Sequence, residues 1–275
     1  MHHEPISLLQ RARFVAAHAW PLETVGKADK LEEGPQIFFT GFGRSGTQLL
    51  TRAFAESTSN VCCVHEPFFK YDVGLSKRFR TNPAYCANFW IKFRRYRMEA
   101  MKSKNKKFSY LEVNGALRYQ ISGIRAAFPH AEIYGLARDP RTVIRSLMGW
   151  KSFYEVGSPE CVSHRPLKND RYYNRWTDMS KFEKLCWLWA DGYSQLLNDH
   201  KIFRLEDIIE MPADLLTEIN IDNLDEVKFA TALLKPSDNS SAGYIFPHHT
   251  EWTPDQIMKI RDICGETAAR IGYSI

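Results

Sequence analysis

The sequence predicts an α/β fold in which helices flank a central parallel sheet. Short apolar runs alternate with longer segments whose apolar residues recur every three or four positions. A glycine-rich turn joins the first apolar run to the helical segment that follows it. Because each run is separated from the next by a stretch long enough for a helical crossover, the strands are expected to be parallel.

Five strands and five helices are expected from these patterns. The apolar runs predict strands at Gln36–Gly41, Val61–His65, Ser109–Val113, Glu132–Ala137 and Lys201–Arg204. The periodic segments predict helices at Gly46–Glu56, Gly115–Phe128, Pro140–Lys151, Lys181–His200 and Pro254–Ile271. Two polar and aromatic stretches without regular pattern, near 71–107 and 153–180, are expected to form lids on the acceptor side of a site.

A single domain spanning residues 1–275 is expected, because 44% of the residues are hydrophobic and no linker divides the chain. The formal charge of +5 favours anionic ligands. The densest basic run, Lys92 to Lys107, is interpreted as the solvated face of a helix and its following loop, so no nucleic-acid partner is expected.

The segment Gln36 to Leu50, QIFFTGFGRSGTQLL, is typical of a phosphate-binding loop between a buried strand and a helix. Glycines 41, 43 and 46 are expected to let the backbone turn tightly, and the amides that open the next helix can face an anion. Nucleotide-hydrolysing P-loops read GxxxxGK[ST], but no lysine follows Gly46 here. The loop is therefore P-loop-like, and it is predicted to hold a phosphate-like group other than a magnesium-bound triphosphate. Its predicted ligand-binding residues are Gly43, Arg44, Ser45, Gly46, Thr47 and Gln48.

A second motif, AEIYGLARDPRTVIRSLMGW, covers Ala131 to Trp150. Asp139 can cap the helix and Pro140 suits its first position, which leaves Arg138 at the carboxyl edge of a strand. Ligands bind at that edge of a parallel sheet. Arg138 and Ser146 can therefore offer a guanidinium and a hydroxyl to a phosphate group.

Together these two motifs resemble those of the sulfotransferases that use 3′-phosphoadenosine 5′-phosphosulfate (PAPS), in the same order along the chain. The resemblance implies that the first loop holds the 5′-phosphosulfate group and that Arg138 and Ser146 hold the 3′-phosphate. It implies transfer of a sulfuryl group to a hydroxyl without a metal ion, with Arg44 stabilising the charge of the phosphosulfate. The expected acceptor is a glycan or another alcohol, and lipids and small alcohols stay open.

The second strand ends in VHEPF, which places His65 and Glu66 near the same edge. The EP pair is similar to that of the carbohydrate sulfotransferases, in which a glutamate deprotonates the acceptor, whereas phenol-type relatives use a histidine. We favour Glu66 as the base, with His65 as the alternative and Glu112 as the next carboxylate near a strand end. Because His65 and Glu66 alternate along an extended segment, only one of them is expected to face the donor.

The chain lacks two elements of the family, a lysine near the third strand and the carboxyl-terminal RKGxxGxW motif. Either Arg44 alone neutralises the leaving group, or a lysine such as Lys151 contributes. Two other classes stay open: a P-loop nucleotide or sugar kinase, disfavoured by the missing lysine, and an inactive relative that binds nucleotides or glycans.

The remaining composition indicates a cytoplasmic protein. The six cysteines show no zinc-type spacing and are expected to be reduced, and the tandem His248 and His249 lack an acidic or cysteine partner at ligand spacing, so no metal site is expected. Residues Met1 to Glu23 contain no long apolar run, so neither a signal peptide nor a membrane span is expected.

Overall fold

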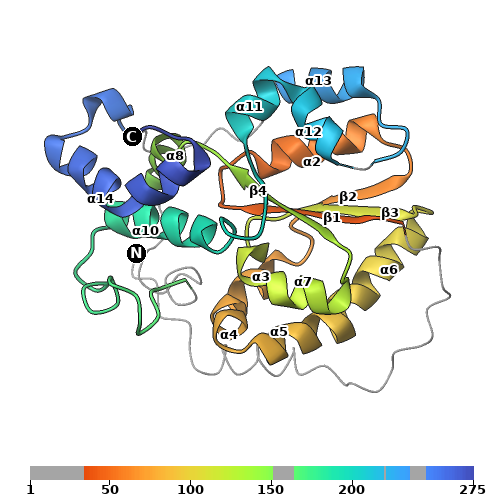
Figure 1. Cartoon of the computed structure of the whole chain (residues 1–275), viewed down its shortest axis with the longest axis horizontal. Coiled ribbons are helices and arrows are strands. Elements are labelled where there is room, and N and C mark those ends of the chain that lie inside the picture. The colour runs from red at the N-terminus through yellow and green to blue at the C-terminus, as the bar shows by residue number, and fades with distance from the viewer. Residues whose placement is uncertain (1–33, 151–163, 220, 236–245) are drawn as a thin grey trace, which may run out of the picture.

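A five-stranded parallel sheet forms the centre of the chain, with strand order β2-β3-β1-β4-β5 (Figure 1). The computed structural model describes residues 34–150, 164–219, 221–235 and 246–275. Its strands are β1 (Gln36–Gly41), β2 (Val61–His65), β3 (Ser109–Val113), β4 (Glu132–Ala137) and β5 (Ile202–Arg204). The predicted α/β class, with a parallel sheet flanked by helices, is confirmed, and the strand bounds agree with the predicted ones except that β5 begins one residue later.

The strands form where apolar side chains fill both faces of the sheet. Ile37, Phe38 and Phe39 of β1 are fully buried, as the central strand of a parallel sheet requires. Helices cover both faces in Figure 1 and form separate apolar clusters with it. One face carries α2 (Thr47–Ser57), α11 (Leu205–Glu210), α12 (Pro212–Glu218) and α13 (Glu226–Leu234).

The opposite face carries α3 (Phe69–Gly74), α4 (Ser76–Thr81), α5 (Pro83–Phe89), the π-helix η1 (Trp90–Arg94), α6 (Arg95–Lys104), the 3₁₀-helix η2 (Leu117–Tyr119) and α7 (Ile121–Ala127). The expectation that residues 71–107 lack regular structure is therefore wrong. Most helices here have six or seven residues, too short for a clear period, and aromatic side chains such as Phe79, Phe89 and Phe93 pack on one another. The lid role of this segment stays a prediction.

The interpretation of Lys92–Lys107 as a solvated face also needs correction. Arg94 is fully buried against Glu112, with 2.7 Å between Nη2 and Oε1, and Lys102 is buried with its ammonium 3.4 Å from Glu99. Other charged side chains of this run, including Lys92, Arg95 and Arg97, are exposed. Arg94 ends the π-helical turn η1, whose buried residues are Trp90 and Arg94.

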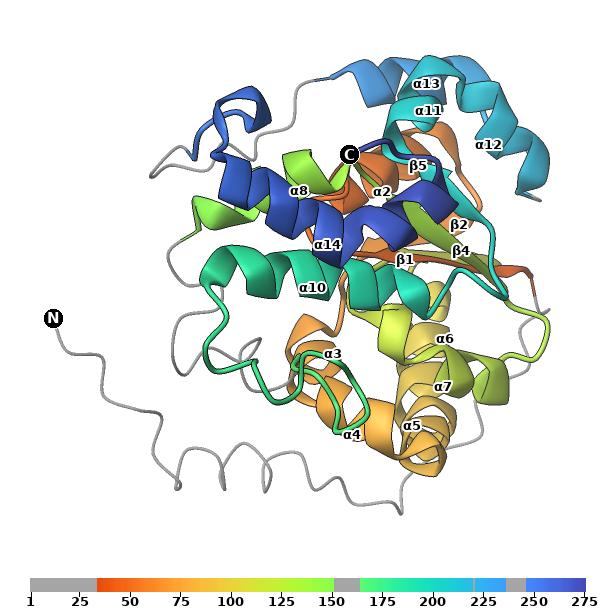
Figure 2. The same cartoon turned by 60° about the vertical axis from the view of Figure 1, so that its left-hand side comes forward.

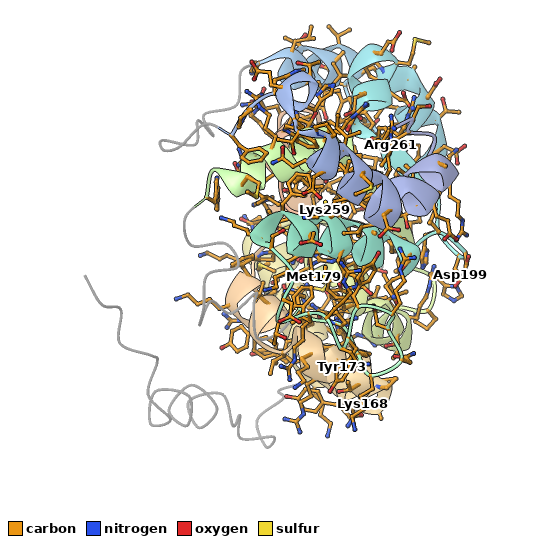
Figure 3. All side chains as sticks on the ribbon, turned by 90° about the vertical axis from the view of Figure 1, so that its left-hand side faces the viewer. Lys168, Tyr173, Met179, Asp199, Lys259 and Arg261 are labelled. Carbon is orange, nitrogen blue, oxygen red and sulfur yellow. The ribbon has the colours of Figure 1, made fainter. Side chains whose placement is uncertain are left out.

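A third helical group, α8 (Pro140–Met148), α10 (Lys181–Ser194) and α14 (Pro254–Ile271), lies beside the sheet, at the left of Figure 1 and in front in Figure 2. Local capping sets their starts. Asp139 Oδ1 accepts a hydrogen bond from the Arg141 amide at 2.8 Å before Pro140, as predicted. Capping boxes open α10 at Ser180 and α14 at Thr253, and Figure 3 shows the two helices side by side with Lys259 of α14 facing α10.

Three predicted helices are shorter than expected, and one of them, α8, ends at Met148. The segment from Gly115 forms the 3₁₀ turn η2 before α7, because the Asn114 and Arg118 side chains bond to its backbone. Helix α10 ends at Ser194 and is followed by turns. The five described cysteines are free thiols, and Cys161 lies outside the described residues. Within the described ranges, none of the helices has the length and apolar character needed to cross a bilayer.

Candidate active site

The glycine-rich loop connects β1 to α2 through two residues in the left-handed conformation, Arg44 at φ 71° and Gly46 at φ 89°. The Ser45 amide bonds back to the Phe42 carbonyl at 3.2 Å and closes the turn. A side chain at Gly46 would be strained at that φ and would also meet Leu205 at 2.6 Å. Gly43 lies in the turn without a positive φ, and the left-handed conformation falls on Arg44 and Gly46.

Hydrogen bonds join Arg44 of the loop to Arg138 and Ser146 of the second motif, which is about 100 positions away in the sequence. Arg44 Nε donates to Ser146 Oγ at 2.9 Å, and Arg138 Nη1 donates to the Arg44 carbonyl at 3.4 Å. Burial, and then the nearby charge of Arg138, lower the pKa of Arg44. Two guanidinium groups held this close repel one another, and a bound anion would relieve that repulsion.

Side chains of helix α10 form hydrogen bonds to the loop and to the backbone at the end of β4. Tyr193 Oη lies 2.9 Å from Ser45 Oγ and donates to the Leu136 carbonyl at 2.8 Å, so it ties the loop to β4. Trp189 Nε1 donates to the Arg138 carbonyl at 3.2 Å. These contacts leave no signal in the sequence, because the aromatic residues of α10 have the spacing of ordinary core residues.

The end of β2 brings both candidate bases to the site. His65 Nε2 lies 2.9 Å from Thr47 Oγ1, and the Gly115 amide donates to Glu66 Oε1 at 3.3 Å. The strand ends at His65, and Glu66 adopts φ 45°. This change of conformation breaks the alternation, and both side chains line one cavity. Which of the two would face the donor stays a prediction.

That cavity has a volume of 330 Å³ and contains most of the predicted site residues. It is lined by Gly43, Arg44, Gly46, Thr47, Gln48, His65, Glu66 and Arg138. The two other predicted residues do not line the cavity: Ser45 is a buried residue of the loop, and Ser146 accepts a hydrogen bond from Arg44. The sequence missed the other lining residues, Leu49, Phe69, Leu147, Trp150, Leu205, Ile209 and Lys235. The volume lies near the lower end of the range for small-molecule sites, about 300 to 1,000 Å³.

Lys235 is the one lysine that lines this cavity in the described part of the chain. It forms an ion pair with Glu56 at the surface. Lys151, the lysine that the sequence suggested, lies outside the described residues.

A smaller cavity of 60 Å³ adjoins the first one and shares Gly43, Glu66 and Phe69 with it. Its other lining residues are Phe42, Val73, Gly115, Ala116, Arg118, His164 and Leu188. Glu66 therefore lies where the two cavities meet. A larger groove of 430 Å³ runs along β5 and α11, but it contains none of the predicted site residues.

Glu66 has the ionisation behaviour of a general base for neutral pH. Burial raises the pKa of its carboxyl to about 7, and the charges of Asp72 and Glu112 act in the same direction. The Gly115 amide and Arg118 oppose that rise. Burial lowers the pKa of His65, which keeps its imidazole neutral at pH 7. Among the described residues, no group of three or more His, Cys, Asp or Glu side chains could hold a metal ion.

Glu66→Gln is expected to stabilise the fold at alkaline pH. Above the ordinary value of 4.5, the unfolded chain loses its Glu66 proton while the folded chain keeps it up to about pH 7. The native protein should therefore lose up to about 3 kcal/mol of stability across that window, at about 1.4 kcal/mol per unit, and the glutamine variant should not. Urea unfolding at pH 4.5 and pH 8 checks this. An equal effect at both pH values would contradict it, and the exposed Glu210→Gln serves as control.

Comparisons with known proteins give similarities to solved structures. No protein-family model matches the sequence, and no curated protein matches it. The structure is similar to a sulfotransferase domain from the olefin synthase of Synechococcus PCC 7002, with 16% identity and a TM-score of 0.46 over 92% of this chain and 100% of that domain. At this TM-score and identity, the similarity assigns neither a family nor an activity to the chain.

Proposed function

We propose that this chain is a sulfotransferase that moves a sulfuryl group from PAPS to the hydroxyl of a small-molecule or glycan acceptor. The observation that carries the proposal is the convergence of Arg44 and Arg138 on one cavity that also contains Glu66, with Ser146 bonded to Arg44 beside it. The two arginines can bind an anionic donor, and the loop lacks the lysine of nucleotide-hydrolysing P-loops, which suits a donor that needs no magnesium. The buried carboxylate of Glu66 beside them can remove the proton of a hydroxyl group.

The described residues fit the proposed donor. The amides that open α2 and the Thr47 hydroxyl would hold the 5′-phosphosulfate, and Arg138 with Ser146 would hold the 3′-phosphate. Because Arg44 Nε contacts Ser146 Oγ at 2.9 Å, Arg44 would add its positive charge beside the residues proposed to hold the 3′-phosphate. Leu205 and Ile209 offer apolar surface for the nucleoside.

In the proposed reaction Glu66 takes the proton of the acceptor hydroxyl. The hydroxyl oxygen forms a bond to sulfur while the bond between sulfur and the bridging oxygen breaks, which releases adenosine 3′,5′-bisphosphate. Arg44 and the loop amides stabilise the charge that develops on the leaving oxygen. Glu66 lies where the two cavities meet, so a donor in the larger one and a hydroxyl entering from the smaller one would face the same carboxylate.

His65 has a supporting part in this scheme. Its Nε2 lies 2.9 Å from Thr47 Oγ1, so a neutral imidazole can fix the direction in which the Thr47 hydroxyl donates. With its hydroxyl held in this direction, Thr47 would donate a hydrogen bond to the phosphosulfate. His65 remains the alternative base, as in phenol-type relatives.

Consumption of the donor with and without EDTA separates the proposed function from its alternatives. With PAPS and a mixture of alcohols, we expect release of adenosine 3′,5′-bisphosphate that is unchanged by chelation. A kinase would consume ATP in place of PAPS and lose activity with EDTA, because phosphoryl transfer needs magnesium. An inactive relative would bind PAPS without turnover in either condition. Either of these two results would overturn the proposal.

A further inference from the structure

A fully buried polar network lies directly behind the turn that follows β3. Arg94 Nη2 donates to Glu112 Oε1 at 2.7 Å and lies 3.9 Å from Asp72 Oδ2. Asn114 Nδ2 donates to both carboxylates, at 2.8 Å to Asp72 and at 2.7 Å to Glu112. All four side chains are inaccessible to solvent. The network thus joins α3, the π-helical turn η1 and the end of β3.

This network connects to Glu66 through one short turn. Asn114 Oδ1 accepts from the Ala116 amide at 2.9 Å, which fixes the peptide groups between them. The Gly115 amide in that turn donates to Glu66 Oε1 at 3.3 Å. The Glu66 amide in turn donates to the Val113 carbonyl at 3.3 Å. Asn114 therefore determines where the one backbone donor to the Glu66 carboxyl lies.

The network also carries more negative than positive charge when both of its carboxyls are ionised. Asp72 and Glu112 face a single cation, Arg94, whose guanidinium lies 4.5 Å from the ring centroids of both Phe68 and Trp90. Burying such a cluster is costly and contributes little to stability compared with an apolar core of similar volume. A functional role would account for its presence next to Glu66.

We propose that the network of Asp72, Arg94, Glu112 and Asn114 is a positioning device for Glu66, which holds the Gly115 donor in place and opposes ionisation of Glu66 through its surplus negative charge. The inference rests on the role of Glu66 in the proposed function. Ionisation of Glu66 can nevertheless be measured without donor or acceptor, so the two can fail independently.

Other charged groups face Glu66 and act beside the network. Arg118 lines the smaller cavity and favours the ionised carboxyl, and His164 lies on the same wall. The larger cavity adds Arg44, His65, Arg138 and Lys235. Within the network, burial raises the pKa of Asp72 to about 6 against the effect of Arg94, so most of the charge of Asp72 is present above that pH.

The decisive measurement is an NMR titration of protein labelled with ¹³C at the glutamate side-chain carboxyl. The Glu66 resonance is identified by its loss in Glu66→Gln. In Glu112→Gln the side-chain carbonyl can still accept from Arg94 and Asn114, but one negative charge is gone, so the Glu66 midpoint should fall by about half a pH unit or more. In Asn114→Ala the Gly115 donor is loosened, so the midpoint should rise. Opposite shifts from two members of one network are the expected result.

Asp191→Asn is the matched control, because Asp191 forms a largely buried ion pair with Arg80 at 3.3 Å but lines neither cavity. In this variant the titration midpoint of Glu66 should equal that in the parent. If Glu112→Gln does not fold, Asp72→Asn removes a charge from the same cluster and should shift the midpoint in the same direction. A network with only a structural role would lower stability and leave the Glu66 midpoint unchanged, and that result would overturn the inference.

Turnover gives a separate readout if sulfuryl transfer is found. The acid limb of its pH profile should move in the same directions as the NMR midpoints. Shifted midpoints without any turnover would support the network and contradict the proposed function. Turnover with unchanged Glu66 midpoints would support the proposed function and contradict the role of the network.

Discussion

Glu66→Gln is expected to lower turnover about a hundredfold to ten-thousandfold while leaving affinity for adenosine 3′,5′-bisphosphate almost unchanged. Glutamine keeps the size of the side chain and can still accept from the Gly115 amide, but it cannot take a proton. Steady-state kinetics with a verified acceptor, together with calorimetry for the nucleotide, measure both quantities.

His65→Asn is the matched comparison, because His65 lines the same cavity and its imidazole contacts Thr47. We expect a mild loss of turnover, with part of the effect on donor binding through Thr47. If the histidine variant loses turnover and the glutamate variant keeps it, the roles are reversed and His65 is the base, as a histidine is in phenol sulfotransferases. Glu112, the fallback carboxylate from the sequence, is fully buried against Arg94 and does not line the cavity.

Arg138→Ala is expected to weaken binding of adenosine 3′,5′-bisphosphate by about a hundredfold, or roughly 2 to 3 kcal/mol. The alanine removes the guanidinium proposed to hold the 3′-phosphate, and it also removes the contact with the Arg44 carbonyl at 3.4 Å. Calorimetry on folded protein measures the change. Unchanged affinity in a folded variant would show that Arg138 does not hold the nucleotide.

Two controls separate a phosphate contact from a general loss of charge. Adenosine 5′-monophosphate lacks the 3′-phosphate, so it should bind the parent weakly and be almost indifferent to Arg138→Ala. Arg141 lies three positions further along and pairs with Asp139 at 2.5 Å outside the cavity lining. Arg141→Ala removes the same charge and should leave nucleotide affinity within about twofold of the parent, as expected of a partly exposed ion pair.

The sheet could be predicted from sequence because its strands are short apolar runs bounded by turns. Val61–His65 and Ser109–Val113 were found with their observed bounds. The helices between β2 and β3 were missed, since six-residue helices show less than two full turns of periodicity and aromatic residues lie on several sides of them.

The candidate site was predictable where it lies on a motif and missed where it depends on tertiary contacts. Arg44, Arg138 and Ser146 lie on two recognisable segments, and the structure brings them together. The support from Tyr193 and the pairing of Arg94 with Glu112 join positions far apart or on different elements, so neither leaves a sequence signal. The joint access of His65 and Glu66 depends on a single positive φ at Glu66.

The central claim is tested most directly by transfer of label from ³⁵S-labelled PAPS to pooled acceptors that carry hydroxyl groups. Glycans, lipids and small alcohols are supplied in separate pools, and products are separated and counted. The proposed function predicts that the parent forms a labelled product from at least one pool. Glu66→Gln should form at least about a hundredfold less of that product. Equal label transfer by both proteins, or no transfer from any pool by a parent that binds PAPS, would contradict it.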